Sequence, residues 1–365
     1  MTLKVLCIDP AGNLWGSEQV LLDMLPVLER FTPAVCCPPR SPLHRELRRR
    51  GVTVLPFYVA NLHKRSKAAR GLACLGVLAS CIAWRPDIIY LNQSGCYKIV
   101  LVVARLIRIP VVAHVRIFED AAYLARQRPT RSRLHGLVAI SNAIANEIRE
   151  HAELAAIPLR MVYDGYAPRR QAPGCSSQPR KGKSLACVGR IVPIKAHDLL
   201  LETLALLLKR IPDVTCSILG TGDGLERDLK VTAQVLGLGR CVQWLGFVSD
   251  PHRVLEVTEL LLLPSHREPL GRVIFEAWDA GCLPVVYAGS GGAAEAITAS
   301  GGGLIYPVQS ADAMASTIAE ALALSPAQRD AYIARGRRWM EEHCSARSYG
   351  SRMEDVFMEA LAIGA

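Results

Sequence analysis

The sequence predicts an α/β protein with two doubly wound domains, each built around a parallel sheet. Short apolar runs alternate with helical segments along most of the chain, which is the pattern of repeated strand–helix units. Residues 169–184 interrupt this alternation, because they are rich in Pro, Gly, Ser, Arg and Lys and have no apolar period. The length of 365 residues also suits two domains. We therefore predict a first domain over 1–168, a linker over 169–184 and a second domain over 185–346.

Apolar runs of four or five residues predict the strands of the first domain, and the segments between them predict helices. The expected strands are 5–8, 34–37, 52–55, 87–91, 111–115 and 138–140, and the expected helices are 19–28, 71–84, 97–108 and 142–151. Ser141 is expected to cap the last of these helices.

The same pattern restarts after the linker. The expected strands are 185–188, 215–219, 242–245, 260–263 and 283–287, and the expected helices are 198–210, a helix from about 271, 310–324 and a helical stretch over 326–362. Pro264 closes one strand, Gly281 has the position of a left-handed helix cap, and Ser310 opens a helix.

Composition excludes several classes of protein. The twelve cysteines include no C-x-x-C pair and no zinc spacing, and the chain has no signal peptide. We therefore expect buried, reduced thiols in a cytoplasmic protein. The longest apolar run, 71–84, is too short to span a bilayer.

The net charge of +10 is concentrated in the first half of the chain. Residues 1–170 hold 24 Lys and Arg against 12 Asp and Glu, whereas the remainder holds 19 against 21. Such a basic half suits an anionic partner. No nucleic-acid motif accompanies it, so we expect no nucleic acid. An anionic membrane surface or a lipid-diphosphate acceptor fits better, and a merely solubilising surface is the alternative.

Two carboxylates mark the segment 261–295. Glu268 precedes the helix expected from Gly271, and Glu276 lies inside that helix. Open parallel sheets bind ligands where strands end and helices begin, and the free N–H groups of a helix start attract phosphate. Glu268 could therefore accept hydrogen bonds from sugar hydroxyls, and Glu276 from a second pair, as on a ribose. A solvated helix face is the alternative.

Other polar residues follow predicted strands. Arg190 and Lys195 flank a turn after the strand 185–188 and are suited to bind a diphosphate. In the first domain, Asn92, His114 and Arg116 lie at strand ends. His114 could instead be a satisfied core histidine.

The loop before the first helix contains Gly16-Ser17-Glu18. Its glycines do not fit G-x-G-x-x-G, which disfavours a dinucleotide oxidoreductase. Ser17 could act simply as the helix N-cap.

Together these segments resemble the family 4 retaining glycosyltransferases, whose GT-B fold has two Rossmann-like domains facing each other across a cleft. The resemblance is carried by Glu-Pro-Leu-Gly-Arg-Val-Ile-Phe-Glu-Ala at 268–277, by Gly189-Arg190 with Lys195, and by Gly-Ser-Glu at 16–18. Ser17 stands where the family has a second Gly, and Ala196 replaces another usual Gly.

The resemblance implies a role for each matched residue. The implied catalytic residues are Arg190, Lys195, Glu268 and His114. The implied donor-binding residues are Gly16, Gly189, Arg190, Lys195, Gly222, Phe247, Glu268, Pro269, Leu270, Gly271, Arg272 and Glu276. The implied acceptor-binding residues are Ser17, Asn92, His114 and Arg116. The terminal helix, about 347–365, is implied to join the first domain.

The activity implied is transfer of a sugar from a nucleotide-diphosphate sugar, most simply a UDP- or GDP-sugar, to an acceptor hydroxyl with retention. No D-x-D pair is present, so we expect no metal and no cofactor. The acceptor would be a glycan or lipid-linked glycan, handled in the cytoplasm or at the cytoplasmic face of a membrane. A nucleotide-sugar epimerase and a non-catalytic nucleotide-sugar-binding subunit are the alternatives.

Overall fold

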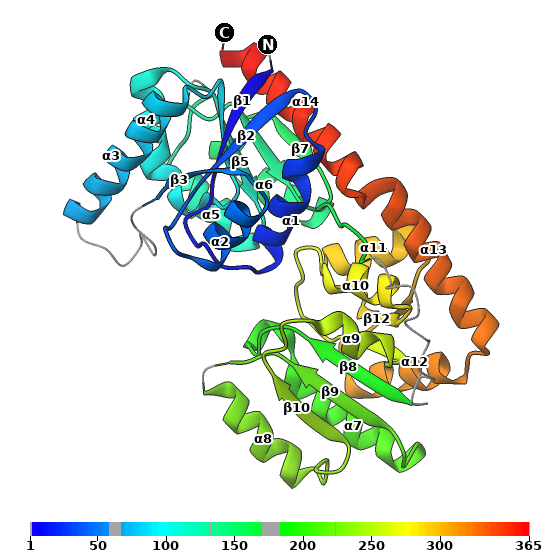
Figure 1. The fold of residues 1–365 in the computed structure, drawn as a ribbon. Coiled ribbons are helices and arrows are strands. Elements are labelled where there is room, and N and C mark those ends of the chain that lie inside the picture. The colour runs from blue at the N-terminus through cyan, green and yellow to red at the C-terminus, as the bar shows by residue number, and fades with distance from the viewer. Residues whose placement is uncertain (1, 58–66, 132, 170–182, 223, 365) are drawn as a thin grey trace. The chain divides into compact units, whose positions relative to one another are not determined.

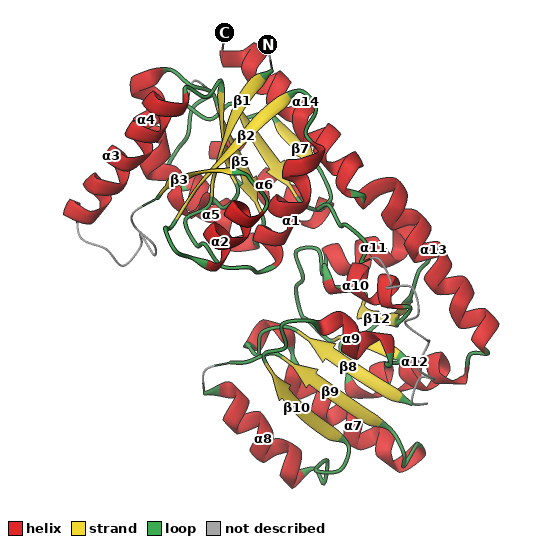
Figure 2. Cartoon of the chain, viewed as in Figure 1, coloured by secondary structure: helices red, strands yellow, loops and turns green. Residues whose placement is uncertain are grey.

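The computed structural model describes residues 2–57, 67–131, 133–169, 183–222 and 224–364. The chain divides into two compact units, one of residues 1–167 with 343–365 and the other of residues 168–342 (Figure 1). Each unit is a parallel sheet with helices on its faces, as Figure 2 shows by secondary structure.

The first domain contains a seven-stranded parallel sheet in the order β3-β2-β1-β4-β5-β6-β7. Its strands are β1 Leu3–Ile8, β2 Phe31–Cys37, β3 Thr53–Pro56, β4 Ile88–Leu91, β5 Val111–Val115, β6 Gly136–Ala139 and β7 Leu159–Met161. Its helices are α1 Gly16–Met24, α2 Pro42–Arg49, α3 Lys67–Trp84, α4 Tyr97–Ile107, α5 Phe118–Ala125, α6 Asn142–Arg149 and α14 Ala346–Gly364. Strands β4, β5 and β6 are buried along their whole length because helices cover both faces of the sheet.

Helix α1 differs from its predicted bounds of 19–28. It begins at Gly16 and ends at Met24, and a 3₁₀ turn, Leu25–Val27, follows. Pro26 accounts for the early end, since it has no N–H to continue the α-helical hydrogen bonds. Helices α2 and α5 lie in segments for which no helix was predicted.

The terminal helix α14 is part of the core of the first domain. Phe357 packs edge-to-face on Phe31, with ring centroids 5.4 Å apart, and lies 5.5 Å from the ring of Tyr90. The carboxylate of Glu354 accepts hydrogen bonds from the backbone N–H of Arg30 at 2.6 Å and from its Nε at 3.0 Å. The first sheet is therefore completed by residues from the far end of the chain.

The second domain contains a six-stranded parallel sheet in the order β10-β9-β8-β11-β12-β13. Its strands are β8 Ser184–Val188, β9 Thr215–Leu219, β10 Val242–Gly246, β11 Leu260–Leu263, β12 Leu283–Tyr287 and β13 Leu304–Tyr306. Its helices are α7 His197–Arg210, α8 Leu225–Val235, α9 Pro251–Glu256, α10 Val273–Ala280, α11 Gly292–Ser300, α12 Ala311–Ala323 and α13 Pro326–Cys344, whose last residues reach the other unit.

Most predicted caps of the helices are present. Ser141 and Ser310 each accept a hydrogen bond from the backbone N–H three residues later, which opens α6 and α12. Gly281 ends α10 in the left-handed conformation, at φ 74° and ψ 24°. Ser17 is not a cap: Trp15 has the N-cap position of α1, and the carboxylate of Glu18 accepts the Trp15 N–H at 3.0 Å.

Both sheets have a point where the order of the strands reverses. In the first sheet it lies between β1 and β4, and in the second between β8 and β11. Loops that leave neighbouring strands in opposite directions open a crevice at the carboxyl edge of such a sheet, and ligands bind there in open α/β folds. These two edges are therefore where functional side chains are expected.

Among the described residues, no helix combines the length and the apolar character that crossing a bilayer requires. The eleven cysteines of the described part of the chain are free thiols, and all except Cys74 are buried.

Candidate functional site

Loops from four strands meet at the carboxyl edge of the second sheet. The N–H of Ile191, after β8, donates to Thr221 O, after β9, at 2.9 Å. On the other side of the reversal, the N–H of Glu268 donates to Ser290 O at 2.5 Å and the N–H of Gly292 donates to Glu268 O at 2.9 Å. These backbone bonds fix the loop that carries Glu268 against the loop after β12.

Two glycines allow these loops to approach closely. A Cβ on Gly222 would lie 2.0 Å from the carbonyl oxygen of Ile191, so a side chain at this position would force the loops apart. Gly271 has φ +74° and lies against Ala293 and the Cγ of Glu268, which is a conformation that favours glycine.

Lys195 and Glu268 form an ion pair at the switch point of this sheet. The same carboxylate oxygen also accepts the Ser265 hydroxyl at 3.1 Å. Glu268 is buried, whereas the Lys195 side chain is about a quarter exposed. The Lys195 ammonium group is therefore accessible to solvent, while the buried Glu268 carboxylate is held by Lys195 and Ser265.

Arg190 provides a second cation at this edge. It is exposed, and its guanidinium forms no hydrogen bond or ion pair with any residue that the structure describes. Gly189 precedes it, and its α-carbon lies beside the aliphatic part of Lys195. A guanidinium and an ammonium group at the same edge of a sheet are suited to bind a diphosphate, whose oxygens accept from both.

Ala196 has the left-handed conformation, with φ 48° and ψ 48°, and is fully buried. L-residues reach this region at a cost, whereas glycine does not. This backbone conformation explains why glycine would suit position 196, where this chain has Ala196 instead.

Glu276 lies in the first turn of α10, because this helix begins two residues later than predicted. Burial raises the pKa of Glu276, and the charges of Arg272, Arg169 and His252 act against that shift. A desolvated carboxylate at a helix start is a strong acceptor for hydroxyl groups.

The remaining predicted donor residues are divided between the core and the surface. Leu270 is buried in front of α10, and Pro269 is half-buried beside it. Phe247 follows β10 and is 72 % exposed, so its ring is available to a ligand. Gly16 is in the first domain, at the start of α1.

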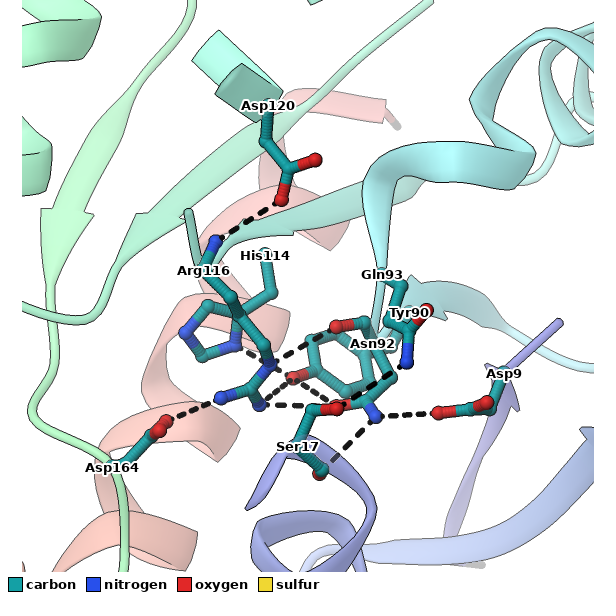
Figure 3. A network of polar contacts seen from close by, with 9 residues as sticks. All are labelled: Asp9, Ser17, Tyr90, Asn92, Gln93, His114, Arg116, Asp120 and Asp164. Carbon is teal, nitrogen blue, oxygen red and sulfur yellow. Dashed lines mark hydrogen bonds and ion pairs between the residues drawn. The ribbon is translucent and has the colours of Figure 1, made fainter. Parts of the chain in front are cut away.

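A second polar cluster occupies the switch point of the first sheet (Figure 3). Asn92 follows β4 and donates through Nδ2 to Asp9, which follows β1, at 2.8 Å. Arg116 follows β5 and donates to Asn92 Oδ1 at 3.0 Å and to the carbonyl oxygen of Asn92 at 3.0 Å. Its other nitrogen donates to Asp164 at 2.5 Å. All four side chains are buried, and each has at least one partner within the cluster.

His114 has no exposed surface. Its Nδ1 lies 2.7 Å from the hydroxyl oxygen of Tyr90, which also faces the guanidinium of Arg116 at 3.4 Å. The Tyr90 hydroxyl can donate its one proton to Nδ1 or to Asn92 Oδ1, which lies 3.4 Å away. Burial, and next the positive charge of Arg116, lower the pKa of His114, so the ring is neutral. Its Nε2 has no hydrogen-bond partner in the described structure.

Ser17 and Glu18 connect α1 to this cluster. Gln93 donates to the hydroxyl of Ser17 at 3.3 Å and to the carboxylate of Glu18 at 2.7 Å. Burial and the negative charge of Asp9 raise the pKa of Glu18. The start of α1 is therefore held at the same edge as Asn92.

The structure thus brings Asn92, His114 and Arg116, three of the predicted acceptor-binding residues, together in the interior of the first domain. The contact of these side chains with an acceptor stays a prediction. Three further residues of the cluster, Asp9, Tyr90 and Asp164, were not predicted as site residues. The position of Asp9 directly after a buried strand was the available indication, whereas Tyr90 lies within a strand and gave none.

Comparison with solved structures identifies the fold. HepE from Anabaena, solved in complex with UDP and glucose, superposes with a TM-score of 0.82 over 98 % of this chain and 99 % of its own, at 20 % identity. The fold is GT-B. Sucrose-phosphate synthase from Thermosynechococcus elongatus is also similar, with a TM-score of 0.74, 16 % identity and 99 % of each chain covered.

Sequence comparison relates the second domain of this GT-B protein to glycosyltransferases. Residues 173–339 match the family model described as Glycosyl transferases group 1. A D-inositol 3-phosphate glycosyltransferase from Saccharomonospora viridis is 30 % identical over 243 residues, which are 62 % of this chain and 56 % of that protein. The chain spans about half the length of the curated relatives it matches. These matches support a relation of the chain to the glycosyltransferases of group 1.

Proposed function

We propose that this protein is a retaining glycosyltransferase of family 4, which transfers a sugar from a nucleotide-diphosphate sugar to an acceptor hydroxyl. The observation that carries the proposal is the arrangement of Arg190, Lys195 and Glu268 at the switch point of the second sheet. Two cations lie where a diphosphate would bind, and a carboxylate lies beside them. The group 1 match over 173–339 covers this arrangement.

The residues supply what departure of a nucleoside diphosphate requires. Negative charge develops on the leaving diphosphate, and Arg190, Lys195 and the N–H groups at the start of α10 stabilise it. Glu268 holds hydroxyls of the donor sugar, and Glu276 holds those of the ribose. Fixed cations can provide this stabilisation without a metal ion, so we propose a metal-independent reaction. We also propose that the first domain binds the acceptor.

The relatives suggest the classes of donor and acceptor. The HepE complex contains UDP and glucose. A relative from Mycolicibacterium smegmatis is named a GDP-mannose-dependent alpha-(1-6)-phosphatidylinositol monomannoside mannosyltransferase. It is 28 % identical over 204 residues, which are 53 % of this chain and 51 % of that protein. We propose a UDP- or GDP-sugar as donor and a glycan or lipid-linked glycan as acceptor. The reaction would take place in the cytoplasm, with the enzyme associated peripherally with an anionic membrane surface.

Thermal shift with UDP, GDP, ADP and their sugar conjugates tests the donor site, because a ligand that binds the folded state raises its melting temperature. We expect one base to raise it and Arg190→Ala to abolish the effect. Lys209→Ala, an exposed lysine at the far end of α7, is the control and should respond like the wild type. A response that Arg190→Ala leaves intact would contradict the assignment of this site.

Two further measurements test the finer parts of the proposal. The anomeric configuration of the product, determined by NMR with the responding donor, reports retention or inversion. Initial rates after treatment with a chelator report dependence on a metal ion. Inverted product or loss of activity restored by a divalent metal would each refute the corresponding part.

A further inference from the structure

Helices α3 and α4 expose large apolar side chains on one surface of the first domain. Leu72, Leu75 and Ile82 of α3 and Val102 and Leu106 of α4 are each more than half exposed, with Leu106 at 70 %. The three residues of α3 are three and seven positions apart, and the two of α4 are four apart, so each set lies along one face of its helix. The two helices pack against each other, as Figure 1 shows at the edge of the first domain.

The exposed residues are not a remnant of incomplete packing. The opposite face of α3 is buried through Ala73, Val77 and Cys81, and that of α4 through Val100 and Val103. Each helix therefore has one apolar face in the core and a second one in solvent. A second apolar face on an amphipathic helix is typical of an interaction surface.

The two helices carry only basic charges. Neither helix contains Asp or Glu, and the exposed charged residues Arg70, Lys98 and Arg105 are all basic. Arg85 and Arg108, which follow the two helices, are exposed as well, and the acidic residue that follows Arg85, Asp87, accepts the backbone N–H of Lys4. A second copy of the chain docked here about a two-fold axis would bring these cations together, which disfavours a dimer. An anionic lipid surface complements both the apolar residues and the charge.

We propose that the surface formed by Leu72, Leu75, Ile82, Val102 and Leu106 inserts into the headgroup region of an anionic bilayer, with the neighbouring Arg and Lys side chains bound to lipid phosphates. This inference deepens the membrane partner of the proposed function by giving it a site.

Flotation with vesicles of phosphatidylcholine alone or with phosphatidylglycerol tests the proposal. The wild-type chain should float with the anionic vesicles at low salt, less at high salt, and not with phosphatidylcholine alone. The double variant Leu75→Glu and Leu106→Glu should lose about tenfold or more of the binding, because both charges face the bilayer. The double variant Val231→Glu and Val235→Glu is the matched control, since both are exposed apolar residues on α8 of the second domain, at 55 % and 81 %.

The nucleotide response, measured on the same preparations, separates this proposal from the proposed function. If nucleotide raises the melting temperature of the wild type but the wild type does not bind anionic vesicles, the proposed membrane surface is wrong and the donor site is still supported. Equal flotation of the wild type and the double variant would also overturn the membrane surface. So would a wild type that does not bind vesicles but self-associates, if the double variant abolishes that self-association. An unchanged melting temperature of the double variant establishes that its loss of binding is not unfolding.

Discussion

Lys195 and Glu268 are 73 positions apart in the sequence and form an ion pair at the point where the strand order of the second sheet reverses. Lys195 comes from the loop after β8 and Glu268 from the loop after β11, which are the two strands that flank the reversal. The pair therefore joins the two halves of the sheet at its carboxyl edge. The Glu268 carboxylate is thus fixed by Lys195 in the absence of any bound sugar.

Replacing either member should reduce activity far more than stability. We expect Lys195→Met and Glu268→Gln each to lower kcat/KM by about 100-fold or more, because each removes a group that stabilises transferred charge or the sugar. The free energy of unfolding should fall by about 1–3 kcal/mol, less than for a fully buried pair, since Lys195 is partly exposed. Initial rates and urea unfolding measure the two effects.

Lys183→Met is the matched control for this prediction. Lys183 precedes the same strand β8 and pairs with Asp213 at 2.7 Å, but it lies at the amino edge of the sheet and is exposed. Its replacement should leave kcat/KM unchanged. Near wild-type activity in Lys195→Met, or equal losses in both lysine variants, would be incompatible with the proposed diphosphate site.

Removal of one member of the buried Arg116–Asp164 ion pair should strongly destabilise the first domain. Asp164→Asn leaves a buried guanidinium without its counter-charge, and removal of one member of a buried pair costs about 3–5 kcal/mol. Urea unfolding should show this loss. The double variant Arg116→Met and Asp164→Leu should recover part of it, because no uncompensated charge remains. An unfolding midpoint of Asp164→Asn equal to that of the wild type would contradict the prediction.

The two ring nitrogens of His114 give a separate prediction, because Nδ1 faces Tyr90 and Nε2 has no partner in the described structure. If Nε2 is the group that acts in transfer, His114→Gln, whose amide nitrogen can take the place of Nε2, should retain more activity than His114→Asn, whose amide lies nearer the position of Nδ1. The ¹⁵N shifts of the imidazole should also report a neutral ring, because burial lowers the pKa of His114. A protonated imidazolium at neutral pH, or greater activity in the Asn variant, would refute the corresponding part.

His197 should make the second domain sensitive to acid. Burial, and next the charge of Lys195, lower the pKa of His197 from 6.5 to about 4. A group whose pKa is lower in the folded state favours folding above its unfolded pKa and loses that contribution as the pH falls toward the folded value. We therefore expect its contribution of about 3 kcal/mol to be complete above pH 6.5 and lost between pH 6.5 and about 4.

Urea unfolding across this pH range measures the effect. His197→Phe keeps an aromatic side chain but cannot take up a proton, so the decline of its stability on acidification should be shallower than in the wild type. Parallel curves for the two proteins would show that protonation of His197 is not the cause.

The second sheet could be predicted closely because its information is local. The strands 215–219, 260–263 and 283–287 have the predicted bounds, since each is an apolar run closed by turn residues. The start of α1 was missed for the opposite reason. Gly16 and Ser17 are weak helix formers, and it is the side chain of Glu18, bonded back to Trp15, that opens the helix earlier.

The two candidate sites differ in the same way. The cations and carboxylates of the second domain each lie in a short motif after a predicted strand, so their place at the carboxyl edge of the sheet could be predicted, although the pairing of Lys195 with Glu268 was not. The cluster of the first domain is assembled from the ends of β1, β4 and β5 and from the segment after β7, and no local pattern relates Asp9 to Asp164. That His114 would be enclosed by Tyr90 depends on the register of β4 against β5, which sequence spacing does not fix.

The place of α14 in the first domain has a consequence for biosynthesis. Tyr349 packs on Gly165, where a Cβ would lie 2.9 Å from it, and Phe357 packs between strands made hundreds of residues earlier. A ribosome delivers all strands of the second sheet before it delivers this helix. The N-terminal half therefore has an uncovered apolar face until this helix has been made. The domain made second is thus the first able to complete its core, which reverses the usual order of cotranslational folding, and we expect the nascent N-terminal half to bind chaperones until α14 covers it.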